Sequence, residues 1–167
     1  MENPSTYEDH RPAREPGVID IDEIVDNFEF LDDWDQRYQY LVELGENLEP
    51  LPDELKTGEN WVRPCMSTVH VAAEAVPGSP GLIRFRGDCD TAVIKGVLAL
   101  LIDLMSSRSL TDIRDMDVDN LFKRLRLEEH LSPNRHVGIY AIVDKMVERA
   151  NALAGTEAEA PMSLKAH

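Results

Sequence analysis

The chain has 167 residues, of which 43% are hydrophobic, and a formal net charge of −15. This length suits one ordinary domain with a buried core, and the apolar content excludes a wholly disordered chain. Residues 1–50 hold 15 acidic residues against 3 basic ones. Because nucleic-acid binding depends on Lys and Arg, we expect no nucleic-acid partner.

Two cysteines, Cys65 and Cys89, are too few for the disulfide framework of a small secreted domain. Residues 1–40 show no signal-peptide pattern. The longest apolar run, Gly96–Ile102, is much shorter than the roughly 20 residues of a membrane span. We therefore expect a cytoplasmic protein without a membrane segment.

The N-terminal part predicts a tail followed by two helices. Residues 1–17 are polar and proline-containing, which is typical of a disordered tail. A single domain is expected over residues 18–155. Its first helix is capped by Asp20 or Asp22, and the second begins near Asp32 or Asp33. The apolar positions that define the two helical faces are Ile21, Ile24, Val25, Phe28 and Leu31, and then Trp34, Tyr38, Leu41, Val42 and Leu48.

The sequence next predicts a proline-containing loop and then a β-hairpin. Residues 49–64 contain three prolines and end in a possible short strand, 60–63. Residues 67–76 alternate as a strand, PGSPG predicts a turn, and residues 82–86 predict the antiparallel partner strand. Cys65 is then expected at the open end of the hairpin.

The second half predicts helices. A helix capped by Asp88 or Asp90 is apolar nearly all round, so it is expected to be buried, with Gly96 allowing a close backbone approach. One or two short helices are expected after Ser109. Ser132 as cap, followed by Pro133, predicts a long last helix that frays after Ala154. Residues 156–167 are expected to be a flexible tail. The fold class is α+β: a small antiparallel sheet of about three strands covered by helices.

Cys65 is the first candidate for chemistry. A lone cysteine in a cytosolic domain is most often a buried small hydrophobe. However, Cys65 follows Pro64 at a junction between loop and strand, beside Arg63. Partial exposure and a neighbouring cation both favour the nucleophilic thiolate, so the residues alone leave a reactive and a structural role open.

Four landmarks in order resemble the SufE family of sulfur-acceptor proteins, which includes CsdE. They are WDQRYQYLVELG, the loop ending in Cys65 with Ser67 and Val69 after it, GDCDTAVIKG, and LSPNRHVG. The resemblance covers residues 20–153 and implies the SufE/IscU-like fold.

The resemblance also implies a sulfur relay. Cys65 would accept persulfide sulfur from a cysteine desulfurase of the SufS or CsdA kind and stimulate that enzyme. An iron–sulfur scaffold would receive the sulfur. Pyridoxal phosphate would belong to the desulfurase, so the chain itself is expected to need no cofactor or metal and to be no autonomous enzyme. A monomer or weak homodimer is expected.

Asp90 and Arg135 are implied as supporting residues, since they match the family's G-D-x-D and S/T-P-x-R segments. The chain departs from the family pattern at Pro64, where glycine is common, and at Met66 and His70, where Gln and Trp are frequent. His70 is a weaker candidate for an acid–base role with Cys65.

Two other functional classes stay open. A reversible Cys65–Cys89 disulfide would make the chain a thiol redox sensor. Alternatively, Cys65, Cys89, Asp90 and His70 could bind a metal, although the paired Cys-x-x-Cys spacing of structural zinc sites is missing.

Overall fold

The computed structural model describes residues 21–63 and 67–166. The predicted tail at 1–17 and the candidate Cys65 therefore lie outside the described residues. Among the described residues there is no helix of the length and apolarity that crossing a membrane would require.

The two N-terminal helices form where the apolar spacing predicts them. Helix α2 spans Ile21–Phe30, so Asp22 lies inside the helix and is not its cap. Helix α3 spans Trp34–Glu46, and its N-cap Asp33 accepts a hydrogen bond from the Gln36 amide at 2.9 Å. A short 3-10 turn, η1 (Asp53–Leu55), lies in the loop that follows.

Within residues 21–63 and 67–166, the sheet has three antiparallel strands in the order β1-β2-β3. Strands β1 (Val69–Ala75) and β2 (Leu82–Cys89) form the predicted hairpin, with Val69 opposite Cys89 at its open end. The third strand is β3 (Arg108–Ser109), which pairs with the start of β2. The prediction of a short strand at 60–63 is wrong, because within the described part of the chain this segment makes only an isolated bridge, from Trp61 to His70.

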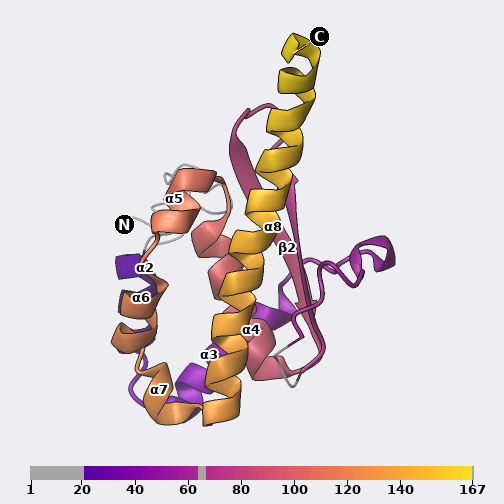
Figure 1. The fold of residues 1–167 in the computed structure, drawn as a ribbon. Helices are drawn as coiled ribbons and strands as arrows, with labels where there is room; N and C mark the ends of the chain where they lie inside the picture. Colours follow the sequence, from indigo (N-terminus) through magenta and orange to yellow (C-terminus); the bar gives the residue numbers. More distant parts are fainter. Residues whose placement is uncertain (1–20, 64–66, 167) are drawn as a thin grey trace, which may run out of the picture.

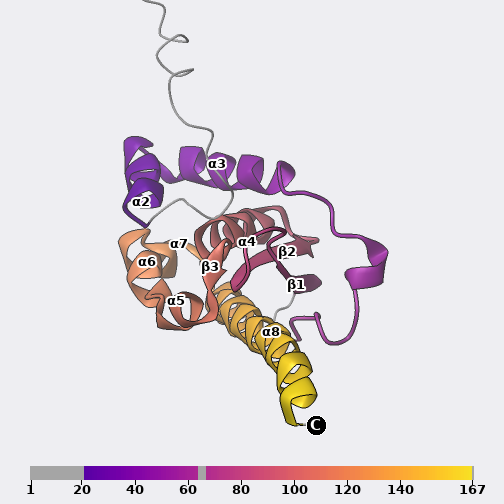
Figure 2. The same cartoon turned by 90° about the horizontal axis from the view of Figure 1, so that it is seen from above.

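Helix α4 (Ala92–Met105) is the centre of the core, as Figure 2 shows: it runs between α3 and α8 and packs on β2. A Cβ atom at Gly96 would overlap the Leu41 carbonyl group, so glycine alone lets α3 cross here. Gly45 contributes from the α3 side, where a Cβ would lie 2.9 Å from the Gly96 nitrogen. The expected close approach at Gly96 is therefore confirmed.

The predicted caps of α4 are wrong. Its N-cap is Thr91, without a capping bond from the side chain. Asp88 belongs instead to β2, which runs three residues further than the alternation at 82–86 indicated. The Asp90 carboxylate accepts hydrogen bonds from the Thr68 amide and the Thr91 hydroxyl.

Three short helices follow where one or two were expected: α5 (Leu110–Asp115), α6 (Val118–Arg124) and α7 (Leu127–His130). Helix α8 (Pro133–Ala166) then crosses the molecule and packs on β1 (Figure 1). It continues past Ala154 through residues 156–166, which were expected to form a tail. The observed architecture confirms the α+β class, with α4 and α8 covering the sheet.

Candidate functional site

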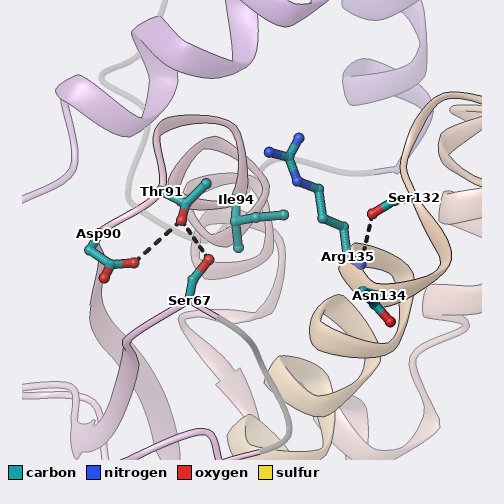
Figure 3. Close-up of a pocket in the computed structure, with 7 residues that line it drawn as sticks. All are labelled: Ser67, Asp90, Thr91, Ile94, Ser132, Asn134 and Arg135. Atoms are coloured by element: carbon teal, nitrogen blue, oxygen red, sulfur yellow. Dashed lines mark hydrogen bonds between the residues drawn. The ribbon is translucent and has the colours of Figure 1, made fainter.

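A pocket of about 420 Å³ lies where the open end of the hairpin meets the first turns of α4 and α8. It brings together Asp90 and Arg135, which the sequence proposed separately. Figure 3 shows the Arg135 side chain reaching from α8 across the pocket toward the α4 side. The described lining residues are Ser67, Asp90, Thr91, Ile94, Ser132, Asn134 and Arg135.

Asp90 holds the chain at the beginning of β1. Its Oδ1 atom accepts a hydrogen bond from the Thr68 amide at 3.0 Å, and its own amide donates to the Thr68 carbonyl at 3.2 Å. These two bonds extend the β1–β2 pairing by one residue beyond the strand end. Asp90 thereby fixes the position of Thr68, three residues after Cys65.

Thr91 joins Asp90 to Ser67. Its hydroxyl donates to Asp90 Oδ1 at 3.3 Å, and it lies 2.5 Å from the Ser67 hydroxyl (Figure 3). Ser67, Thr91 and Asp90 therefore form one hydrogen-bonded chain on the pocket wall. No sequence pattern singled out Thr91, because a threonine between a strand and a helix is an ordinary residue there.

Ser132 caps α8 as predicted. Its Oγ accepts the Arg135 amide at 3.3 Å, and its carbonyl accepts the His136 amide at 3.0 Å. Arg135 is exposed, and it makes no ion pair with any residue in the described part of the chain. The guanidinium therefore remains available to an anion in the pocket.

The pocket suits a negative charge. Thr91 and Ser132 are the residues at which α4 and α8 begin, and unpaired amides give each helix N-terminus a partial positive charge. Arg135 adds a full positive charge. The one carboxylate among the described lining residues, Asp90, already accepts bonds from Thr68 and Thr91.

His70 is not one of the described residues that line the pocket. It lies in β1 opposite Asp88, half-buried. Burial lowers the pKa of His70 below its usual range, and Lys56 lowers it further, against the opposing effect of Asp88. Its proposed pairing with Cys65 stays a prediction.

Cys89 is buried at the end of β2, 6% exposed. Its sulfur accepts the Thr91 amide at 3.4 Å and donates to the Thr91 carbonyl at 3.6 Å. These contacts stabilise the turn from β2 into α4. They give Cys89 a structural role beside the pocket.

Metal ligands do not gather in the described part of the chain: no three His, Cys, Asp or Glu side chains there could hold a metal ion together. The metal hypothesis named Cys65 as one ligand, and that residue lies outside the described part. It therefore stays an untested alternative.

Comparison with known proteins identifies the family. The model of the SufE family, described as an Fe-S metabolism associated domain, matches residues 22–150. The chain belongs to the SufE family. This confirms the resemblance that the four sequence landmarks indicated.

Individual relatives of this SufE-family chain support the same family assignment. A SufE-like protein of Rhizobium meliloti strain 1021 is 33% identical over 134 residues, which cover 80% of this chain and 96% of the relative. A SufE-like protein of Rhizobium etli is 35% identical over 139 residues, covering 82% and 93%. The solution structure of a hypothetical protein from Thermus thermophilus shares the fold, with a TM-score of 0.65 and 18% sequence identity. The match covers 81% of this chain and 96% of the Thermus chain.

Proposed function

We propose that Cys65 takes sulfur from the persulfide of a pyridoxal-phosphate-dependent cysteine desulfurase, stimulates that enzyme, and passes the sulfur to iron–sulfur cluster assembly. Membership of the SufE family supports this proposal. The observation that carries it is the position of Ser67 on the wall of an anion-favouring pocket. Ser67 lies two residues after Cys65 in the sequence, and two residues of extended chain span at most about 7 Å.

The transfer step is a thiol exchange. The Cys65 thiolate attacks the outer sulfur of the donor persulfide, a sulfur–sulfur bond forms on Cys65, and the donor's sulfur–sulfur bond breaks. The donor cysteine leaves as a thiolate. Because the outer sulfur moves with its oxidation level, the step needs no external oxidant or reductant.

The residues of the pocket would support this step by electrostatics. Thiolates and persulfide anions are favoured near helix N-termini and cations, which lower the pKa of a thiol. Arg135 and the first turns of α4 and α8 supply these charges. Asp90 would act as a positioning residue, because it fixes Thr68 and, through Thr91, Ser67.

The test uses the full chain, a cysteine desulfurase and free cysteine, followed by intact mass spectrometry. We expect the mass of one added sulfur atom, which is lost on treatment with a reductant. Cys65→Ser should abolish the addition. No addition to the wild-type protein with any cysteine desulfurase of its own organism would overturn the proposal.

Cys89→Ser in the same assay separates the relay from the redox sensor. The relay predicts that this variant still gains sulfur on Cys65, because Cys89 is buried and contacts Thr91. A sensor that cycles through a Cys65–Cys89 disulfide would lose its function in the variant. Loss of transfer in a folded Cys89→Ser protein would therefore contradict the relay as proposed.

A further inference from the structure

A second cavity, which we call the α8 groove, lies beside the candidate site. It has a volume of about 530 Å³ and runs between the segment 61–63 and one face of α8. Its lining residues are Trp61, Val62, Arg63, Ala141, Asp144, Lys145 and Glu148. The proposed sulfur transfer assigns no role to this groove.

The walls of the α8 groove are held in place. On one side, Lys145 donates to the Glu59 carbonyl at 3.2 Å, and Arg149 lies 3.7 Å from the Glu59 carboxylate. On the other side, the Val62 amide donates to the Val69 carbonyl at 2.8 Å, which ties the segment to β1. The groove is therefore formed before any partner arrives, which lowers the entropic cost of binding.

The groove exposes side chains that are typical of protein interfaces. Trp61 is 39% exposed, and the Arg63 guanidinium lies 4.7 Å from the centre of its ring. Tryptophan and arginine are enriched among the residues that dominate binding energy at interfaces. Arg63 is exposed and makes no ion pair within the described residues, so it can bind a carboxylate from a partner.

The same face of α8 continues from the α8 groove to the candidate site. Asn134 lines the pocket, Ala141 lines the groove, and Val137 lies between them at helical spacing, 58% exposed. Arg63 lines the groove, and Ser67 lines the pocket. Each of these two residues lies two positions from Cys65 in the sequence, so a protein that delivers sulfur to Cys65 is expected to contact the surface that joins the groove and the pocket.

We infer that the α8 groove is the docking surface for the sulfur donor, an inference that rests on the proposed function. The donor would insert a protruding segment with an apolar side chain against Trp61 and Val137 and a carboxylate toward Arg63. The carboxylate belongs at the Arg63 end, because Arg63 makes no ion pair within the described residues, whereas on the opposite wall Lys145 is already paired with Glu148 and Asp144 repels acids.

The test measures binding and chemistry separately, by calorimetric titration with the desulfurase that loads the wild-type protein and by alkylation of Cys65 with iodoacetamide. Trp61→Ala and Val137→Asp should each raise Kd about tenfold or more, the loss expected for a residue that dominates an interface. Arg63→Glu should weaken binding more than Arg63→Gln, and the difference should shrink at high salt. The alkylation rate of the Trp61 and Val137 variants should match that of the wild type.

The matched control is Phe30→Ala, which removes another exposed aromatic ring, 85% exposed at the end of α2. It should leave Kd unchanged. Wild-type affinity in both the Trp61 and Val137 variants would overturn the docking surface while the sulfur transfer stands. A wild-type protein that gains no sulfur would instead overturn the proposed function itself. Val137→Asp covers the case in which Trp61→Ala does not fold, since the Val137 side chain is mostly exposed.

Discussion

Helices α4 and α8 differ in how much of their surface is exposed, and therefore in their roles. Helix α4 is buried along almost its whole length: ten of its 14 residues are buried. Helix α8 buries Ile139, Ile142 and Met146 but exposes Val137 on the opposite side. A helix buried nearly all round contributes mainly packing and offers only its first turn to the pocket, whereas a helix with one exposed face can present residues to a partner.

The largest effect should follow from a change in α4. Gly96→Ala places a Cβ atom into the Leu41 carbonyl group, so α3 and α4 have to separate. We expect a loss of at least about 3 kcal/mol in the free energy of unfolding, the upper end of the usual cost of overpacking. Urea denaturation followed by circular dichroism measures it.

The control for this change lies on α8. Gly155 is exposed, and a Cβ there would meet nothing within 4 Å. Gly155→Ala should therefore stabilise the protein by roughly 0.5–1 kcal/mol, the usual gain in a helix. Equal stability of the Gly96 and Gly155 variants would show that α4 does not pack as tightly as described.

An intermediate effect is expected at the exposed start of α8. Arg135→Gln removes the positive charge of the pocket, so the thiolate of Cys65 should be less favoured. Sulfur transfer should slow several-fold at neutral pH and recover at higher pH, while the melting temperature stays unchanged. The pH profile of Cys65 alkylation checks this.

Arg114→Gln, an exposed arginine at the end of α5, is the matched control and should leave the profile unchanged. If both arginine variants behave like the wild type, Arg135 does not act on Cys65.

The smallest effect should appear where β2 meets α4. Burial would raise the pKa of Asp88, but the Cys89 amide at 2.9 Å, together with Lys95 and Lys56, outweighs it and lowers the pKa. A carboxylate with a lowered pKa stabilises the fold above its unfolded pKa of about 4, and this contribution is lost as pH falls through the lowered value. Asp88→Asn should therefore be less stable than the wild type at neutral pH, by a margin that shrinks in acid.

Thermal melts of both proteins across the acidic range measure that margin. Asp53→Asn removes an exposed carboxylate near the same Lys56 and should not reproduce the effect. A margin independent of pH would show that the Asp88 charge contributes nothing.

Several predictions succeeded because they depend on neighbours in the sequence. The spacing of Ile24, Val25 and Phe28 placed α2, and Ser132 with Pro133 placed the start of α8. The alternation on both sides of PGSPG gave the hairpin. In each case the repeat of one helix or strand decides the outcome, so a short window of sequence contains the signal.

The errors concern contacts between distant segments. Asp90 looked like a helix cap, yet its carboxylate bonds to Thr68, which lies 22 residues earlier. Residues 60–63 resembled a strand, whereas the third strand is Arg108–Ser109, which is too short to show an alternation. Gly45 forms half of the crossing between α3 and α4, a contact that no local pattern indicates.

Local patterns and ordered motifs were enough to predict the family, the fold class and the central place of α4. They could not predict that Asp90 and Arg135 share one pocket, that Thr91 links Asp90 to Ser67, or that a groove beside Trp61 continues along α8. The physical reason is that a pocket forms where separate elements meet, and the angles at which helices and strands pack are set by the whole core rather than by any one segment.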